Sequence, residues 1–333
     1  MPSKFRGMKV LGSGHALPKA RLLSTDIDTR LGHPQGWTER HTGIASRYIC
    51  ETENQIDLAE LAARRALATA GYVATNVDLL IFAAAVPYQS IPATAPLLQR
   101  RLGIPDGRCA AFDVNSTCLS FLTASDIAAS FLAGGSYSCC LVVSSEIASR
   151  GLPWETDPLV ASLFGDGAAA ALLAPGDGTA GVVAARMETY PSGYEDCALG
   201  AGGTRYDFHR DPAMFARHAV FEMEGRALFR HTVSFFGQFL ERLLDTAGWR
   251  REDVDLVVPH QASPIALSHL AQRCGFGSQS IVNIMHDHGN QIAASIPTAL
   301  DFARSSGRLA DGMRMLMLGT SAGLSFGGLA MIV

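Results

Sequence analysis

The sequence predicts an α/β protein built from two related halves, and a repeat together with its apolar runs carries this prediction. Residues 69–72 (Thr-Ala-Gly-Tyr), followed by 78–81 (Asp-Leu-Leu-Ile), recur with the same internal spacing as 246–249 (Thr-Ala-Gly-Trp) and 255–258 (Asp-Leu-Val-Val). Runs such as 79–85 are apolar without the alternation of a half-exposed strand, which is typical of strands that helices cover on both faces. We therefore expect layers of helix and sheet in which a helix-loop-strand unit occurs twice.

Helix and strand signals justify these elements in chain order. In the first half an amphipathic stretch at 56–67 predicts a helix, Gly71 provides its stop, and the run after it predicts a buried strand. In the second half the corresponding helix is expected at 233–244, with Gly248 as its stop. Near the end of the chain two further buried strands are expected on either side of a Gly/Ser turn, at 315–318 and 329–333.

A long polar segment marks the division between the halves. Residues 176–217 are rich in Gly, Ser, Tyr and charge, which favours a long excursion over a flexible linker. The sequence therefore predicts an N-terminal half at 1–175, a connecting excursion at 176–217 and a C-terminal half at 218–333.

Composition excludes several classes of function. The 333 residues are 48% hydrophobic and 17% charged, which describes a compact globular chain. A formal net charge of −4 and the lack of a Lys/Arg run exclude a nucleic-acid partner. Seven cysteines without a CxxC pair fit neither a disulfide framework nor a zinc site, and no apolar leader follows the basic N-terminus. We expect a cytoplasmic protein.

One segment has features of a membrane span. Residues 315–333 are uncharged, and Gly319, Gly323 and Gly327 have the spacing of packed membrane helices. Four glycines and several hydroxyl residues interrupt the segment, however, which favours the two buried strands. We therefore expect no membrane partner.

Three polar residues stand where apolar runs end. Cys118 lies between a strand-like run and a helix of small residues, so helix N–H groups are expected to face its sulfur and to favour the thiolate. A lone cysteine is more often a small buried hydrophobic residue. His260 and Asn290, however, each follow an apolar run in the second half, and active sites of duplicated α/β folds often form where the halves meet. Together the three residues indicate a catalytic site.

These residue types suit thioester chemistry. A cysteine thiolate can accept an acyl group from one thioester and pass it on. An uncharged histidine N–H and an asparagine N–H can together stabilise an enolate, and the backbone N–H groups of Cys118 and of Gly323 form a candidate oxyanion hole for acyl transfer. No metal is expected, because the neighbouring His286, Asp287 and His288 point in different directions and no further ligand cluster accompanies them.

The spaced set of motifs resembles the β-ketoacyl-ACP synthase III (KAS III) family of the thiolase superfamily. The resemblance covers about residue 8 to the C-terminus, and its specificity comes from the order of motifs. These are Gly36-Trp-Thr-Glu-Arg-His-Thr-Gly-Ile44, Asp113-Val-Asn before Cys118, Phe164-Gly-Asp-Gly-Ala, His260-Gln-Ala, and His288-Gly-Asn290 before Ala-Ala-Ser-Ile-Pro297.

The resemblance implies an α/β thiolase-like five-layered αβαβα fold, a homodimer, and Cys118, His260 and Asn290 as the catalytic triad. In that family an acyl-CoA or acyl carrier protein acylates the cysteine, and the histidine and asparagine assist decarboxylation of a malonyl thioester before carbon–carbon bond formation. Neither metal nor redox cofactor is implied, since CoA or phosphopantetheine thioesters are substrates. The pathway implied is fatty-acid or specialised-metabolite biosynthesis.

Residues expected to contact substrate include several departures from the family pattern. Trp37 suits adenine stacking, Arg40 stands beside His41 where the family has arginine, and Ile91 aligns with a residue that shapes the acyl pocket across the dimer. Ser263 and Gln291 replace family residues next to the catalytic motifs. Pro158 and Ile265 fall where the family has basic residues that grip CoA and the carrier protein.

Two alternatives to the decarboxylating synthase remain at this stage. An acyltransferase or non-decarboxylating condensing enzyme on the same fold is consistent with the departures at Pro158, Ser263, Ile265 and Gln291. A non-catalytic scaffold subunit is expected to have lost part of the triad, and all three residues are present here.

Overall fold

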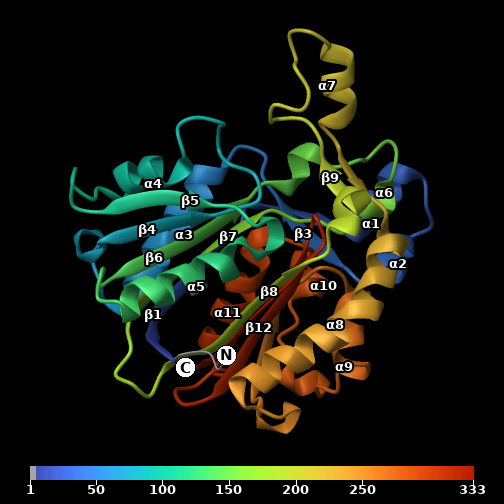
Figure 1. The fold of residues 1–333 in the computed structure, drawn as a ribbon. Coiled ribbons are helices and arrows are strands. Elements are labelled where there is room, and N and C mark those ends of the chain that lie inside the picture. The colour runs from blue at the N-terminus through green and yellow to red at the C-terminus, as the bar shows by residue number, and fades with distance from the viewer. Residues whose placement is uncertain (1–4) are drawn as a thin grey trace.

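The computed structural model describes residues 5–333 (Figure 1). Its first half contains β1 (Arg6–Ala16), β2 (Ala20–Leu23), α1 (Ser24–Leu31), α2 (Trp37–Thr42), β3 (Ser46–Ile49), α3 (Gln55–Ala70), β4 (Leu79–Ala83), α4 (Thr94–Leu102), β5 (Ala110–Val114), α5 (Ser120–Ala133), β6 (Cys140–Glu146), α6 (Pro158–Ala161) and β7 (Gly167–Pro175). The remainder contains β8 (Gly181–Thr189), β9 (Cys197–Leu199), α7 (Pro212–His218), β10 (Phe221–Met223), α8 (Gly225–Ala247), β11 (Leu256–Pro259), α9 (Pro264–Gln272), α10 (Met285–His288), α11 (Ser295–Ser305), β12 (Arg314–Ser321) and β13 (Ser325–Ile332).

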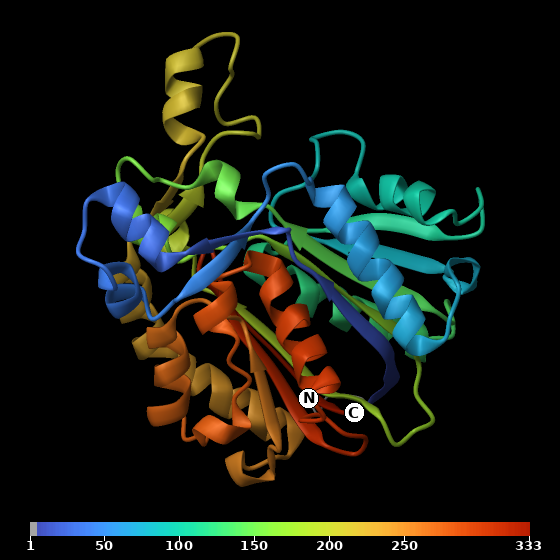
Figure 2. The ribbon, with the colours of Figure 1, turned by 180° about the vertical axis from the view of Figure 1, so that it is seen from behind.

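Three hydrophobic cores define five layers and confirm the predicted fold class. One core joins α3 and α4 to the outer face of β4, β6 and β7, and another joins α8 and α9 to β11, β12 and β13. The central core places α5 and α11 between the two sets of strands. Figure 2 shows β1, in dark blue, running between α3 and α11. The layers are therefore helix, sheet, helix, sheet, helix.

The strands of both halves join into one nine-stranded sheet. Its order is β11-β12-β13-β8-β1-β7-β6-β4-β5, so the two sets of strands meet where β1 pairs with β8. That junction has only two residue pairs, Arg6 with Val182 and Gly7 with Gly181, whereas β1 and β7 pair along most of their length. The parallel neighbours β5, β4 and β6 present their carboxyl ends together, and β11 and β12 do the same in the second half.

The sequence repeat corresponds to a structural repeat. Gly71 ends α3 with φ 70°, and Gly248 ends α8 with φ 68°, a left-handed conformation that glycine adopts without strain. In each copy a short 3₁₀ turn follows and leads into a fully buried strand, β4 or β11. The expected helix-loop-strand unit therefore occurs in both halves.

The segment between the halves contains structure that the sequence analysis missed. The predicted boundaries of the halves stay a prediction, but 181–189 forms β8, which pairs along β13 inside the sheet. After β9 the chain leaves the body as an arm that carries α7 (Figure 1). The uncharged C-terminal segment forms the antiparallel pair β12 and β13, as expected, and none of the helices in the described part of the chain is long and apolar enough to cross a bilayer.

Candidate active site

Cys118 lies at the carboxyl end of β5, in a 3₁₀ turn (η2, Thr117–Leu119) that leads directly into α5. The strand-to-helix placement expected from the sequence is therefore confirmed. The turn is fixed from both sides: the Thr117 N–H donates to Asn115 Oδ1 at 2.9 Å, and the Thr117 hydroxyl donates to the Ala322 carbonyl at 3.3 Å. The second contact ties the nucleophile turn to the β12–β13 turn of the other half.

The environment of the Cys118 thiol differs from the sequence expectation. Burial raises the pKa of Cys118 well above its ordinary value, the nearby Cys197 and Glu146 raise it further, and backbone N–H groups of Ala322 and Cys118 oppose the rise. The expected lowering of this pKa by the helix end is wrong, because desolvation of the sulfur outweighs the amide dipoles. These surroundings therefore favour the thiol form of Cys118 over the thiolate.

The β12–β13 turn supplies the backbone groups that face the sulfur. The amide hydrogen bond to Cys118 comes from Ala322, one residue before the expected Gly323. Gly323 has φ 76° and permits the tight turn that brings this amide inward. The pair of Cys118 and Ala322 N–H groups is a candidate oxyanion hole, and a part for the Gly323 N–H stays a prediction.

His260 follows β11 and is uncharged, as the sequence reasoning required. Burial lowers its pKa to about 4, and only 5% of the residue is exposed. Its Nδ1 lies 2.6 Å from the hydroxyl oxygen of Ser295, which accepts the Gln261 N–H at 3.3 Å. When the Ser295 O–H donates to Nδ1, the neutral ring carries its proton on Nε2. The ring can then donate from Nε2.

Asn290 is held by backbone and side chain together. Its backbone N–H donates to the Leu163 carbonyl at 2.8 Å, and its backbone carbonyl accepts the Gly165 N–H at 3.0 Å. Two residues of the first half of the chain therefore hold the backbone of Asn290, which belongs to the second half. The side-chain Oδ1 accepts the Ile292 N–H at 2.8 Å, which fixes the orientation of the amide. One Nδ2 hydrogen points to the Ala262 carbonyl at 3.3 Å, and the other remains for a ligand.

The segments that carry these three residues meet near Gly319 of β12. A Cβ added to Gly319 would lie 2.9 Å from both the Cβ of His260 and a methyl carbon of Leu119, the neighbour of Cys118. The turn that carries Cys118 also packs against η7 (Ile292–Ala294), which follows Asn290. The structure thus places Cys118, His260 and Asn290 at the junction of the halves, where the sequence predicted them.

Backbone strain marks the same place. Within residues 5–333 the non-glycine residues with positive φ are Thr117, Ile292 and Leu324, at 55°, 51° and 48°. Each stands within two residues of Cys118, Asn290 or Ala322. Such conformations are costly for residues with a Cβ, most of all for β-branched Thr and Ile, and they cluster at functional sites where surrounding contacts enforce them.

Two residues predicted to contact substrate have other contacts. Ser263 caps α9, because its Oγ accepts the Ala266 N–H at 3.2 Å. Gln291 is completely buried and donates to the Asp166 carbonyl at 3.1 Å. Neither arrangement presents the side chain as an open binding surface, and both are explained by local backbone groups that need a partner.

The residues expected at the nucleotide end lie on or near α2. Trp37 opens this helix and is stacked between His33 and His41, with ring centroids 3.9 Å and 4.1 Å away. Both of its faces are covered, so an adenine has to displace one imidazole to stack there. Arg40 is exposed beside it, with a 3.4 Å contact to the Gln35 carbonyl.

Sequence reasoning missed three residues that contact the site. Ser295 stood inside a quoted motif, but its contact with His260 depends on the position of α11. Ala322 was overlooked in favour of the neighbouring glycine. Glu146 could have been noticed in the sequence because it is a carboxylate at the end of an apolar run. Its place near Cys118 depends on the order of the strands in the sheet, which the local sequence does not specify. Within residues 5–333 no group of three or more His, Cys, Asp and Glu side chains is placed to hold a metal ion.

Comparisons with known proteins agree with this geometry. The family model of 3-oxoacyl-[acyl-carrier-protein] synthase III matches residues 112–191, and the model of its C-terminal part matches 244–332. Beta-ketoacyl-[acyl-carrier-protein] synthase III of Rhizorhabdus wittichii is 35% identical over 98% of this chain and 99% of its own. The synthase of Neisseria meningitidis is 33% identical over 96% of this chain and 97% of its own.

Solved structures agree as well. The 3-oxoacyl-[acyl-carrier-protein] synthase III of Aquifex aeolicus superposes with a TM-score of 0.88 at 31% identity, over 98% of this chain and 100% of its own. The enzyme of Pseudomonas aeruginosa gives 0.87 at 30%, over 98% of each chain. OleA of Xanthomonas campestris gives 0.85 at 24%, over 99% of each chain, which shows the fold alone.

The fold and the site together define a condensing enzyme of the thiolase fold, an acyltransferase that works on thioesters. Within that class, the chain belongs to the β-ketoacyl-[acyl-carrier-protein] synthase III family.

Proposed function

We propose that this enzyme transfers an acyl group from acyl-CoA or an acyl carrier protein to Cys118 and then condenses it, with loss of CO2, with a malonyl thioester. The observation that carries the proposal is a neutral His260 and an Asn290 amide with a further N–H, on segments that lie beside the turn of Cys118. Two neutral donors are what an enolate requires, because a cationic or acidic group there would protonate it.

In the first step the sulfur of Cys118 attacks the carbonyl carbon of the donor thioester. The carbonyl oxygen becomes an oxyanion that the N–H groups of Cys118 and Ala322 bind, the bond to the donor sulfur then breaks, and the proton lost from the Cys118 S–H ends on the departing thiol. An acyl-enzyme with a new thioester at Cys118 remains. The energetic cost is small, since one thioester replaces another.

In the second step the malonyl thioester loses its carboxylate as CO2. The electron pair moves into an enolate, whose oxygen accepts hydrogen bonds from His260 Nε2 and Asn290 Nδ2. The enolate carbon attacks the acyl carbonyl on Cys118, the oxyanion hole binds the tetrahedral intermediate, and the cysteine thiolate leaves. The product is a β-ketoacyl thioester.

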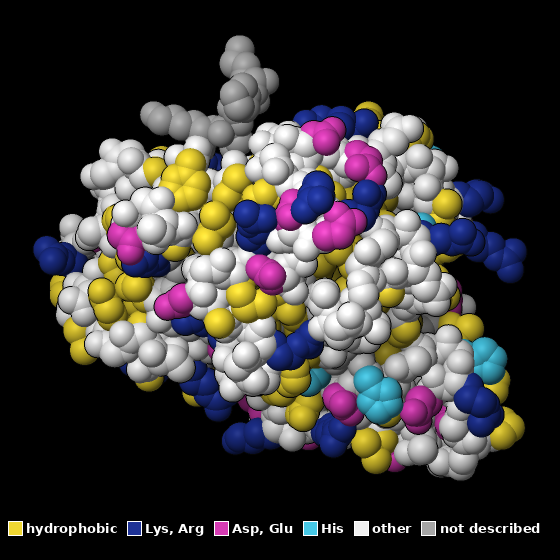
Figure 3. All heavy atoms as spheres, turned by 90° about the horizontal axis from the view of Figure 1, so that it is seen from below, with side chains coloured by type: hydrophobic (Ala, Val, Ile, Leu, Met, Phe, Trp, Pro, Cys, Tyr) yellow, Lys and Arg dark blue, Asp and Glu magenta, His cyan; other side chains and the backbone are white. Residues whose placement is uncertain are grey.

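Charged side chains outside the site support delivery of the substrate by a carrier protein. The part of α8 from Gly225 to Leu240 contains Arg226 and Arg230 and no acidic residue, and both arginines are exposed. On α9 Ile265 is 63% exposed where the family has a basic residue. We propose that an acidic carrier protein binds α8 and that Trp37 and Arg40 contact the nucleotide of CoA. Seen from below, the surface in Figure 3 has Lys and Arg interspersed with Asp and Glu.

A homodimer is supported by the exposed edge of the first half. β5 ends the nine-stranded sheet, so one side of its backbone is unpaired, and all five of its residues are only half-buried. The adjacent β4–α4 loop exposes Val86, Tyr88 and Ile91, with 87% of Ile91 accessible. We propose that β5 pairs with its copy and that Ile91 enters the partner's acyl pocket.

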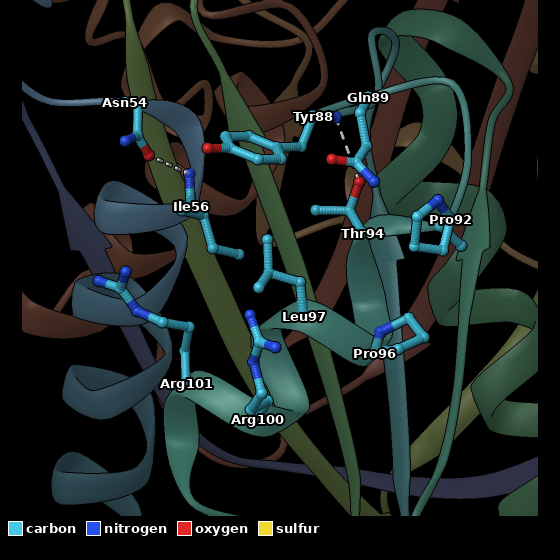
Figure 4. A pocket seen from close by; sticks show the side chains of 11 residues that line it. Asn54, Ile56, Tyr88, Gln89, Pro92, Thr94, Pro96, Leu97, Arg100 and Arg101 are labelled. Carbon is cyan, nitrogen blue, oxygen red and sulfur yellow. Dashed lines mark hydrogen bonds between the residues drawn. The ribbon is translucent and has the colours of Figure 1, made fainter.

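Hollows flank this loop and fit such an arrangement. One of about 500 Å³ lies between the loop and α4, with Tyr88, Leu97 and Arg100 among its lining residues (Figure 4). Another of about 270 Å³ lies between the loop and the end of β5. We also propose a cytoplasmic setting, which the seven free cysteine thiols support, and chemistry that needs only CoA or phosphopantetheine thioesters.

Intact-protein mass spectrometry tests the proposed function. Wild type and Cys118→Ala are incubated with a panel of acyl-CoAs, and malonyl-CoA or malonyl carrier protein is then added. We expect an acyl adduct on wild type alone, discharged by the malonyl donor with release of CO2. An adduct that ignores malonyl donors would indicate an acyltransferase that uses another acceptor, and lack of any adduct would contradict the assignment of Cys118.

A further inference from the structure

Glu146 is a buried carboxyl group that the proposed mechanism does not use. It is the last residue of β6, and 1% of it is exposed. Among the described residues it forms no ion pair, so its charge is not compensated by a Lys, Arg or His side chain. Burial raises its pKa to about 8, against the effect of the backbone N–H groups that bind it. A carboxyl group buried at such cost requires a reason.

The hydrogen bonds of Glu146 come from two segments that form walls of the site. Its Oε1 accepts the Ala85 N–H at 2.6 Å, and the Val86 N–H also binds the carboxyl group. Both amides open the β4–α4 loop, which carries Ile91. A third donor is the N–H of Ala293, in the turn directly after Asn290.

The Ala293 contact affects the direction in which the side-chain amide of Asn290 points. Asn290 Oδ1 accepts the N–H of Ile292, whose backbone is held at φ 51°. A β-branched residue does not stay in that conformation without support from its surroundings. The Glu146 carboxyl supports the next peptide group and thereby keeps the Ile292 N–H pointing at Asn290.

The same carboxyl also acts on the nucleophile through charge. Glu146 is one of the groups that raise the pKa of Cys118, so above pH about 8, where the carboxyl group is ionised, its negative charge disfavours the thiolate. The other charged group that acts on Glu146 is Asp166, which lies against Cys50 and Ser149. Removal of the Glu146 charge is therefore expected to make Cys118 more reactive, whereas removal of its hydrogen bonds is expected to loosen the Asn290 turn.

We propose that Glu146 is a positioning residue for the condensation step: it holds the turn of Asn290 and the loop of Ile91 in one arrangement. This inference rests on the proposed function for the condensation step only. Its effect on the thiol needs no assumption about donor or acceptor.

Glu146→Gln, Glu146→Asp and a control, Asp301→Asn, test the proposal. Asp301 is likewise a buried carboxyl, which accepts hydrogen bonds from Ser13 at 2.6 Å and lies 2.5 Å from His15, on the far side of α11 from η7. The measurements are the rate of Cys118 alkylation by iodoacetamide at pH 8.5, the kcat and KM for discharge of the acyl-enzyme by the malonyl donor, and thermal unfolding.

Glu146→Gln is expected to alkylate faster than wild type and to condense roughly ten- to a hundred-fold more slowly, with KM for the malonyl donor little changed. Glu146→Asp keeps the carboxyl group, but its shorter side chain no longer reaches the backbone N–H groups that bind Glu146. Alkylation is therefore expected to stay as slow as in wild type, and condensation is expected to be slower than in wild type. Asp301→Asn changes neither rate. Simple loss of structure would lower Tm, expose Cys118 to the reagent and slow condensation, so a lowered Tm together with slow condensation overturns the proposal.

A Glu146→Gln enzyme that condenses at the wild-type rate also overturns it. If wild type itself does not react with the malonyl donor, the proposed function fails separately from this inference. The alkylation rates then still test the effect of Glu146 on the thiol, and equal rates in wild type and Glu146→Gln contradict that effect.

Discussion

Replacement of Ser295 by alanine isolates the contribution of one hydrogen bond to condensation. The Ser295 hydroxyl lies 2.6 Å from His260 Nδ1 in a region with no exposed surface at Ser295, so water does not replace it without rearrangement. Loss of a partner by a buried polar group costs about 1–3 kcal/mol. Without the donor at Nδ1, the ring proton is no longer held on Nε2, where the enolate needs it.

The expected result is a reduction of kcat for malonyl-dependent discharge by roughly 5- to 100-fold, which corresponds to about 1–3 kcal/mol. Acylation of Cys118 is expected to stay within about two-fold of wild type, since that step uses the other oxyanion hole. The assay is single-turnover discharge of a preformed acyl-enzyme, followed by mass spectrometry.

Thr298→Ala provides the matched control. Thr298 is on the same helix, is also buried, and donates its hydroxyl to the Ala294 carbonyl at 2.7 Å without contacting His260. If Ser295→Ala and Thr298→Ala condense at the same rate, the reasoning about the His260 tautomer is refuted.

Three further predictions concern pH, packing and the carrier. Because His260 has a pKa of about 4 when folded and an ordinary value of 6.5, the folded state loses up to roughly 3 kcal/mol of stability as pH falls from about 6.5 to 4, and urea unfolding of His260→Gln should show a smaller loss over that window. Gly319→Ala places a methyl group 2.9 Å from His260 and Leu119, so it should lower the free energy of unfolding by about 1–3 kcal/mol and reduce activity. Gly237→Ala on α8 meets nothing within 4 Å and should raise the free energy of unfolding by about 0.5–1 kcal/mol. Equal Tm values for the two variants would contradict the packing argument. Arg226→Glu with Arg230→Glu should raise KM for a malonyl carrier protein several-fold and leave KM for malonyl-CoA unchanged, and an equal change with both donors would contradict carrier binding on α8.

Much of the fold could be predicted from the sequence because the repeat and the buried strands are local signals. The two glycine stops and the apolar runs identified helix-loop-strand units that the structure contains. β8 was missed, since it lies in a segment whose Gly and charge content suggested irregular structure, and its partners β13 and β1 are distant in sequence.

The placement of Cys118 and His260 after strand ends was predictable from the sequence, the catalytic roles of Cys118, His260 and Asn290 stay a prediction, and the electrostatics of the site were not predictable. The order of motifs located Cys118, His260 and Asn290. The direction of the Cys118 pKa shift was not predictable, because it depends on how deeply the sulfur is buried and on Glu146 and Cys197, which other strands bring beside it. The capping contact of Ser263 and the buried contact of Gln291 likewise depend on neighbours that no local pattern specifies.

The central claim is that His260 and Asn290 stabilise an enolate formed by decarboxylation and that Cys118 holds the acyl group it attacks. The most direct measurement is the yield of CO2 and of β-ketoacyl product from acyl-enzyme mixed with a malonyl thioester, in wild type, His260→Ala and Asn290→Ala. The account predicts one CO2 and one β-ketoacyl thioester per acyl group in wild type, and acylated but condensation-deficient variants. Equal product yields from wild type and from both variants would contradict it.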